Sequence, residues 1–218
     1  MVFDWAVELG YCETNPSSQI KPERAFGSKP VAHHASIPLK DVPDLMKRLA
    51  AEKEIQSVLA CKLLALTWVR TGELRGMKWE QIEGDLWRLP ASLMKKRREH
   101  LVPLSKQALE LLERLRERCR NSPYVFPSDR RLDRAMSENS ILYMLGRIEY
   151  KGKMTGHGFR SIASTWANER GYPSDAIEKQ LAHDADNKVR SAYNQAEYIN
   201  ERRQMLQDYA DWLDQCRS

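Results

Sequence analysis

Residues 157–193 decide how the rest of this chain is interpreted. They contain three short motifs: His157-Gly158-Phe159-Arg160, then Leu181-Ala182-His183, then Ala192-Tyr193-Asn194. A guanidinium fork can hold two oxygens of a phosphodiester, imidazoles exchange protons near neutral pH, and a phenol can attack phosphorus. Taken singly, such residues are more often packing or helix-surface residues. Together they favour phosphoryl transfer, and the rest of the chain must supply the missing groups.

The composition predicts a folded, soluble protein with one sizeable core. Of its 218 residues, 30% are charged and 42% hydrophobic, which argues against disorder. A net charge of +5 mildly favours polyanionic partners such as nucleic acid. The four cysteines lie far apart, so they predict neither a zinc site nor a disulfide framework. Without a signal peptide or a long apolar run, we expect a cytoplasmic protein that has no membrane partner.

The N-terminal part predicts a short helix followed by a linker. Val2, Trp5, Ala6 and Leu9 share one helical face, and Gly10 can end that helix. Residues 15–38 contain four prolines and no sustained periodicity, which is typical of a linker. His33 and His34 fall there without Cys or carboxylate neighbours, so we assign them no metal.

Two helices and an unusual arginine follow. Residues 41–51 form an amphipathic pattern with Asp41 as N-cap, and residues 54–67 are apolar on nearly all sides, as in a central core helix. Arg70 comes directly after that apolar helix, and Glu73 follows three residues later. A half-buried arginine needs an anionic partner, so Glu73 could hold Arg70 while leaving part of its fork free.

The pattern then changes to three short strands, at residues 79–82, 86–89 and 101–104. The loop between the last two strands carries four consecutive cations, Lys95, Lys96, Arg97 and Arg98. A charge run is more often a solvated surface, but on a basic protein the tip of a cationic hairpin is also a good phosphate contact.

The remaining elements are predicted to be helices. They span residues 105–120 with Ser105 as the first residue, 137–148 with Ser137 as the cap, a segment following Arg160, and 175–181 before His183. Past residue 193, two seven-residue ladders form an apolar stripe on a terminal helix: Tyr198, Met205, Trp212 and Ile199, Leu206, Leu213. The stripe could pack on its own domain or on a neighbouring copy.

At this point the residues resemble the tyrosine recombinase (phage integrase) family, particularly the integrases of phages and genomic islands. Five matches occur in the family's order: residues 67–76, Met94-Lys95 before residues 100–105, residues 157–160, residues 181–183 and residues 192–194. The resemblance implies a predominantly α-helical α+β catalytic domain with a small three-stranded antiparallel sheet, over residues 31–218. It makes residues 1–30 the last helix and linker of a preceding core-binding domain.

The resemblance also assigns six catalytic residues. They are two arginines that clamp the phosphate, a lysine that acts as general acid, two histidines that handle protons and contact the phosphate, and a tyrosine nucleophile. In that order they are Arg70, Arg160, Lys95, His157, His183 and Tyr193. Glu73 matches the carboxylate that supports the first arginine, and Lys96, Arg97 and Arg98 are expected to bind DNA.

Nearby residues compete for three of these roles. The competitors are Arg75, Lys96 and Tyr198. The family places its arginine three residues before the acidic residue, the register of the next strand favours the first lysine, and Tyr198 belongs to the apolar ladder. The chain departs from the family at Trp68, where a glycine is usual, and at Thr71, where a proline is frequent.

The resemblance implies cleavage and rejoining of double-stranded DNA through a 3′-phosphotyrosyl intermediate, in site-specific integration or excision of a mobile element. Because the clamp consists of side chains, we expect no metal ion, cofactor or small-molecule substrate. We expect a tetramer on DNA, with the terminal helix docked on a neighbouring copy. The alternatives are a type IB topoisomerase-like enzyme, a noncatalytic DNA-binding remnant of an integrase and a metal phosphoesterase that uses the histidines.

Overall fold

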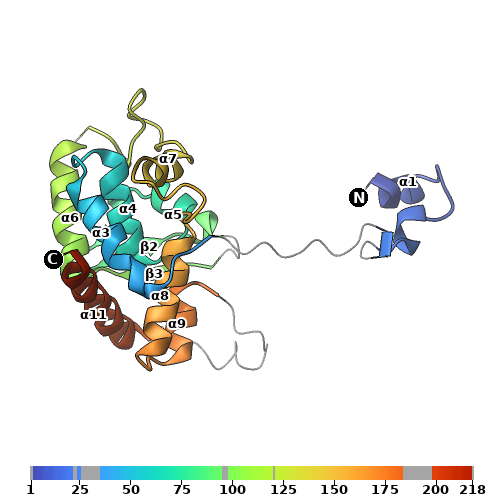
Figure 1. The fold of residues 1–218 in the computed structure, drawn as a ribbon. Coiled ribbons are helices and arrows are strands. Elements are labelled where there is room, and N and C mark those ends of the chain that lie inside the picture. The colour runs from blue at the N-terminus through green and yellow to red at the C-terminus, as the bar shows by residue number, and fades with distance from the viewer. Residues whose placement is uncertain are drawn as a thin grey trace. The chain divides into compact units, whose positions relative to one another are not determined.

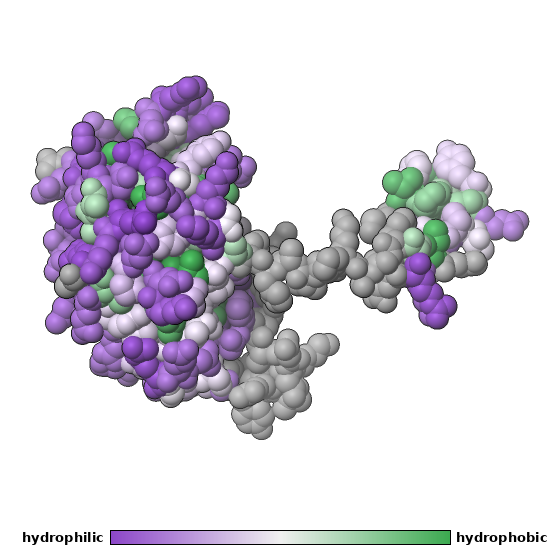
Figure 2. All heavy atoms as spheres, viewed as in Figure 1, coloured by the Kyte–Doolittle hydropathy of each residue, from purple (hydrophilic) through white to green (hydrophobic). Residues whose placement is uncertain are grey.

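The computed structural model describes residues 2–21, 24–25, 35–94, 98–119, 121–183 and 198–217. The chain forms two compact units, Met1–His33 and His34–Ser218. In the first unit, helix α1 (Val2–Glu8) buries none of its residues. Its exposed apolar side chains give this unit the green surface in Figure 2. Gly10, with a φ of 73°, follows the helix as the sequence predicts.

The second unit is mostly helical and contains one small sheet (Figure 1). Its described elements, with η for short 3₁₀ turns, are η2 (Leu39–Asp41), α3 (Val42–Ala51), α4 (Gln56–Thr67), α5 (Thr71–Arg75), η3 (Trp79–Gln81), β1 (Ile82–Glu83), β2 (Leu86–Leu89), η4 (Ala91–Leu93), β3 (His100–Pro103), α6 (Lys106–Arg118), α7 (Ser140–Arg147), α8 (Gly158–Glu169), α9 (Ser174–Gln180) and α11 (Ile199–Arg217). The predicted class, predominantly helical with a small antiparallel sheet, is confirmed. No helix within the described ranges combines the length and apolarity that crossing a membrane requires.

Helix α4 forms the centre of this unit. Its residues from Val58 to Thr67 are buried except Lys62, as the all-round apolar pattern predicts. It contacts α5, α6, α7, α8 and α11, which surround it in Figure 1. The other helices bury only one face, and the visible outer surface of the unit in Figure 2 is mostly hydrophilic. Ser105 accepts a hydrogen bond from the backbone N–H of Ala108 at 3.3 Å and so starts α6 as predicted.

The sheet is antiparallel with strand order β1-β2-β3. The register pairs Leu86 with Pro103 and Leu89 with His100, so β2 and β3 form the predicted hairpin. Trp87, Leu89 and Val102 are buried and anchor the hairpin to the core.

Two predicted boundaries are wrong. Residues 79–81 form a 3₁₀ turn rather than a strand, because the Gln81 side-chain oxygen accepts hydrogen bonds from the Lys78 backbone at 3.0 Å and from the Trp87 indole at 3.1 Å. Ser137 does not cap the next helix. The backbone N–H of Met136 pairs with the Phe126 carbonyl at 2.8 Å, so the chain stays extended there and α7 begins only at Ser140.

Helix α11 packs on its own unit, against α3, α4, α8, α9 and β3. Its buried side chains include Met205, Leu206, Tyr209 and Leu213. Tyr209 meets the Trp68 ring edge-on at 5.2 Å between ring centroids and the Trp166 ring at 5.0 Å. The apolar stripe is therefore a docking face, as predicted, and in the single chain it covers that chain's own core.

Candidate active site

Arg70 lies at the junction of α4 and α5, where the chain leaves the buried core. Its Nη1 donates to Glu73 Oε1 at 2.7 Å, and its backbone N–H donates to Glu73 Oε2 at 2.8 Å. The carboxylate is buried, whereas the Arg70 side chain is 35% exposed. Glu73 thus fixes one edge of the guanidinium and leaves the other N–H groups available to a ligand, as expected.

Trp68 turns the chain between α4 and Arg70. It caps α4 with a left-handed backbone, φ 61° and ψ 14°, a conformation that glycine adopts far more readily. The strain is offset by complete burial of the indole ring, which packs on Tyr209. The turn therefore forms without a glycine, and the Trp68 carbonyl accepts a hydrogen bond from Arg160.

Arg160, in the first turn of α8, is the donor to the Trp68 carbonyl. Its Nη1 donates to the Trp68 carbonyl, and its Nη2 donates to the Leu181 carbonyl at 2.6 Å. Only 3% of Arg160 is exposed, and its buried Nε has no hydrogen-bond partner among the described residues. The Trp68 and Leu181 carbonyls therefore hold the Arg160 guanidinium in one orientation.

His183 follows α9 and completes the cluster. Its Nε2 lies 3.3 Å from Arg160 Nη2, and its Nδ1 lies 2.9 Å from Glu178 Oε2. A guanidinium can only donate, so Nε2 must accept. The proton of the neutral ring is therefore on Nδ1, which donates to Glu178, and His183 is oriented between a carboxylate and an arginine.

The electrostatics of this cluster favour an anion. Burial, followed by the nearby positive charge of Arg70, lowers the pKa of Arg160 from 12.5 to about 10, while Glu73 and Glu178 act in the opposite direction. Arg160 remains charged at neutral pH. The charge of Arg70 acts on Arg160, and an anion such as a phosphate would favour the charged form of both guanidiniums.

Comparison with known proteins identifies the family. The model of the Phage integrase family matches residues 36–199. The chain belongs to the phage integrase family. Its relatives include the prophage integrase IntZ of Escherichia coli (strain K12), 43% identical over 216 residues, and the integrase of Enterobacteria phage P4, 36% identical over 236 residues. The matches take in 98% and 100% of this chain and 53% of each relative, so the chain spans about half of their length.

Solved structures share the fold of this phage integrase family member. A lambda integrase (residues 75–356) dimer bound to a COC' core site aligns over 89% of this chain and 69% of its own, with a TM-score of 0.62 and 18% identity. A lambda integrase tetramer bound to a Holliday junction aligns over 85% of this chain and 56% of its own, with a TM-score of 0.62 and 18% identity. The integrase of mycobacterium phage Brujita gives a TM-score of 0.60 at 18% identity, over 94% of this chain and 67% of its own.

Of the other residues predicted for this phage integrase site, the structure describes His157 and Arg98. His157 is exposed at the start of α8, one helical turn before Arg160. Arg98 is exposed just before β3. Four predicted residues lie outside the described part of the chain: Lys95, Lys96, Arg97 and Tyr193.

The structure also separates Arg70 from its competitor. Arg75 Nη1 donates to the Met136 carbonyl at 3.1 Å and supports the chain before α7. Arg70, in contrast, interacts electrostatically with Arg160. Sequence reasoning missed Glu178 and the Trp68 and Leu181 carbonyls. Backbone acceptors leave no mark in a sequence, and a carboxylate five residues before a histidine is not a regular helical pair.

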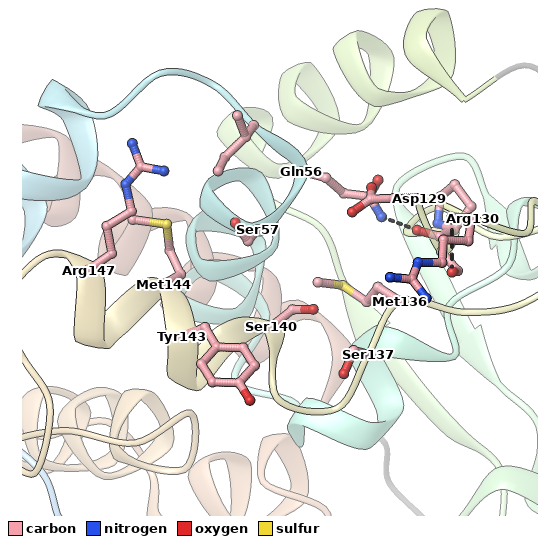
Figure 3. Close-up of a pocket in the computed structure, with 13 residues that line it drawn as sticks. Gln56, Ser57, Asp129, Arg130, Met136, Ser137, Ser140, Tyr143, Met144 and Arg147 are labelled. Atoms are coloured by element: carbon pink, nitrogen blue, oxygen red, sulfur yellow. Dashed lines mark hydrogen bonds between the residues drawn. The ribbon is translucent and has the colours of Figure 1, made fainter.

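The pocket of about 690 Å³ shown in Figure 3 is lined by residues outside this cluster. It lies between the start of α4, the polar loop of residues 127–137 and α7, and its lining includes Ser57, Arg130, Ser140, Tyr143 and Arg147. It shares Met136 and Ser137 with a smaller pocket that reaches Thr71 and Gly72 beside Arg70. Within the described residues, no group of three or more His, Cys, Asp or Glu side chains is gathered as a metal site.

Proposed function

We propose that this phage integrase chain cleaves and rejoins DNA in site-specific recombination, through a covalent 3′-phosphotyrosyl bond to Tyr193. The observation that carries the proposal is the way in which Arg70 and Arg160 are each held by hydrogen bonds. One guanidinium is oriented by Glu73, the other by two main-chain carbonyls and His183, and they come from distant parts of the chain. This is the donor arrangement that a phosphodiester requires when it gains charge in a transition state.

The chemistry explains why two arginines are useful. A phenol has a pKa of about 10, so roughly one molecule in a thousand is ionised at pH 7, and the phosphodiester that it attacks is also anionic. Guanidiniums on the nonbridging oxygens lower both barriers, and one comparable donor contributes about 3–4 kcal/mol in other enzymes. The phosphotyrosine retains the energy of the broken strand, so a 5′-hydroxyl can reseal it without ATP.

The remaining roles follow from this step. Lys95 protonates the leaving 5′ oxygen. His183, with its Nδ1 turned to Glu178 and its Nε2 turned to Arg160, is the residue proposed to activate the phenol. His157 is left to contact the phosphate.

Double-stranded DNA is the proposed partner. The cationic hairpin that carries Lys96, Arg97 and Arg98 can bind phosphates. The pocket of Figure 3 adds serine hydroxyls and the guanidiniums of Arg130 and Arg147, the kinds of donors that position a DNA backbone. Assembly of four chains on DNA follows the lambda integrase tetramer bound to a Holliday junction.

The test is formation of a covalent adduct. The chain is incubated, in EDTA, with a nicked duplex carrying the junction at which its own genetic element inserts, and adducts are separated on a denaturing gel. Wild type is expected to form an adduct and Tyr193→Phe none. No wild-type adduct, or equal adduct from both proteins, would contradict the proposal.

The same assay separates the alternatives. A noncatalytic remnant would shift the DNA on a native gel without forming an adduct. A metal phosphoesterase would cleave only without EDTA. A topoisomerase-like enzyme would relax plasmids that lack the junction sequence and would not exchange two partner sites.

A further inference from the structure

Arg202 is a fully buried arginine outside the cluster described so far. It lies on α11 with 0% of its surface exposed. Its Nε donates to Gln180 Oε1 at 2.9 Å, and its Nη2 donates to the Leu101 carbonyl on β3. A buried guanidinium is a poor source of stability, because an apolar side chain of similar size often serves folding equally well. Its contacts indicate a different use.

Gln180, which accepts the hydrogen bond from Arg202, also contacts α4. It is also completely buried, and its Nε2 donates to the Thr67 carbonyl at 2.9 Å. These two hydrogen bonds, from Arg202 to Gln180 and from Gln180 to Thr67, therefore connect α11 with the end of α9 and with the end of α4. A side-chain amide oriented by a charged donor keeps its own donor group aimed at a fixed place.

The two segments that Gln180 joins are those that hold Arg160. Trp68 follows Thr67, Leu181 follows Gln180, and the carbonyls of Trp68 and Leu181 accept the hydrogen bonds of the Arg160 guanidinium. His183 lies two residues further on and contacts the same Arg160 nitrogen. A shift of Gln180 would therefore move both acceptors of the Arg160 guanidinium at once.

We propose that Arg202 and Gln180 are positioning residues, which fix the Trp68 and Leu181 carbonyls and thereby aim Arg160 at the phosphate. The role in cleavage rests on the function proposed above for Arg160. The orientation of Arg160 itself does not depend on that function and can be measured separately.

Three variants of the full chain test this. Arg202→Met keeps most of the volume and removes the donors. Gln180→Glu is isosteric: it keeps an acceptor for Arg202 and removes the donor to the Thr67 carbonyl. Arg203→Met is the matched control, because Arg203 is the next residue of α11 and pairs with Asp85 at 2.9 Å on the surface.

The first measurement is the ¹⁵N side-chain NMR spectrum of the arginines without DNA. The Arg160 signal is identified by its loss in Arg160→Lys. In wild type and in Arg203→Met we expect slow rotation of the hydrogen-bonded guanidinium, and in the other two variants faster rotation and a shifted signal. An unchanged Arg160 signal in folded Gln180→Glu and Arg202→Met overturns the inference, and if Arg202→Met does not fold, Gln180→Glu decides alone.

The second measurement is single-turnover adduct formation at saturating DNA. We expect Arg202→Met and Gln180→Glu to react at least 10-fold more slowly, with DNA affinity within twofold of wild type, and Arg203→Met to react normally. If both react at the wild-type rate, the inference is wrong. If wild type forms no adduct, the proposed function fails, and the NMR result still decides whether the two residues position Arg160.

Discussion

Glu73 commits both carboxylate oxygens to one residue, the backbone and the side chain of Arg70. Because the carboxylate is buried while the arginine is partly exposed, the pair differs from an ordinary surface ion pair. The ion pair orients the Arg70 guanidinium before DNA binds. Arg70 therefore loses less conformational entropy when the DNA is bound.

Replacing Glu73 by Gln should therefore reduce catalysis. The amide keeps one acceptor but loses the charge, and a hydrogen bond to a charged group contributes about 1.5–3 kcal/mol, or about 10- to 150-fold in rate. We expect slower adduct formation in that range. Glu80→Gln is the control, since exposed Glu80 pairs with Lys78 at 3.4 Å on the surface. Equal rates for the two variants would show that Glu73 does not orient Arg70.

His100 gives a prediction for stability against pH. Burial, together with the charge of Arg202, lowers the pKa of His100 from 6.5 to about 3. The unfolded chain binds a proton below pH 6.5 and the folded chain does not until about pH 3, so stability present above pH 6.5 is lost as the pH falls through that window. Between pH 7.5 and 5 the loss is about 2 kcal/mol.

Urea unfolding at pH 7.5 and pH 5 measures this loss. His100→Gln, which cannot titrate, should show a smaller decrease in the free energy of unfolding than wild type. A decrease of the same size in both proteins would contradict the assignment to His100.

At this scale the sequence singled out Arg70, Glu73, Arg160 and His183 as candidates, because each lies in a motif of fixed spacing. It also predicted that Glu73 holds Arg70, but it did not predict the carbonyls that hold Arg160. Gln180 is buried by segments that lie far away in the sequence, so its use depends on the fold. A single glutamine at the end of a helix belongs to no motif, so the sequence alone does not indicate that Gln180 is buried and hydrogen-bonded.

Among the elements, α5 is the shortest helix of the site and depends on a glycine outside it. A Cβ added at Gly156 would lie 2.2 Å from Cγ2 of Thr71, the first residue of α5. Gly156 is therefore required for a close approach of two segments rather than for its backbone angles.

Gly156→Ala should displace the start of α5 and with it Arg70. Overpacking of this kind destabilises by about 1–3 kcal/mol, and we expect a lower melting temperature together with slower adduct formation. Gly72→Ala is the control within α5, since nothing lies within 4 Å of a Cβ there. Adding Thr71→Ser to Gly156→Ala removes the clashing methyl group and should restore both properties; failure to restore either would assign the defect elsewhere.

The regular elements were predictable where periodicity alone determines them. Helices α3, α4 and α6 and strand β2 fall at or within two residues of the expected bounds. The errors at Trp79 and Ser137 arise where a hydrogen bond overrides the local preference. Lys78 and Trp87 donate to the Gln81 side chain in one case, and Met136 donates to the Phe126 carbonyl in the other.

For the whole molecule, the open question is whether α11 leaves its own unit. In the single chain, α11 packs on its own unit, which is one of the two arrangements expected from the sequence. The other arrangement, docking on a neighbouring copy when DNA is bound, stays a prediction. Deleting α11 cannot test it, because deletion also uncovers Met205, Leu206 and Leu213 in the chain's own core.

A crosslink can test it. Arg203 on α11 and Asp85 beside β2 form an ion pair at 2.9 Å. In a chain with Cys12→Ser and Cys119→Ser, the substitutions Asp85→Cys and Arg203→Cys allow joining by a short bis-maleimide. We expect links within one chain in the free protein and links between chains on junction DNA, seen as dimers on a denaturing gel. Only intrachain links on DNA would rule out the exchange.

The burial of Arg202 also limits how integrases can be recombined with one another in the laboratory. In a chimera that takes its last helix from a relative, the residue at position 202 comes from the relative. Its hydrogen-bond partners, Leu101 on β3 and Gln180 on α9, still come from this chain. A junction between residues 183 and 199 would separate them, whatever the similarity of the flanking sequences. A chimera joined before Ala35 keeps Leu101, Gln180 and Arg202 from one parent. Libraries that exchange N-terminal parts should therefore contain far more active chimeras than libraries that exchange C-terminal helices.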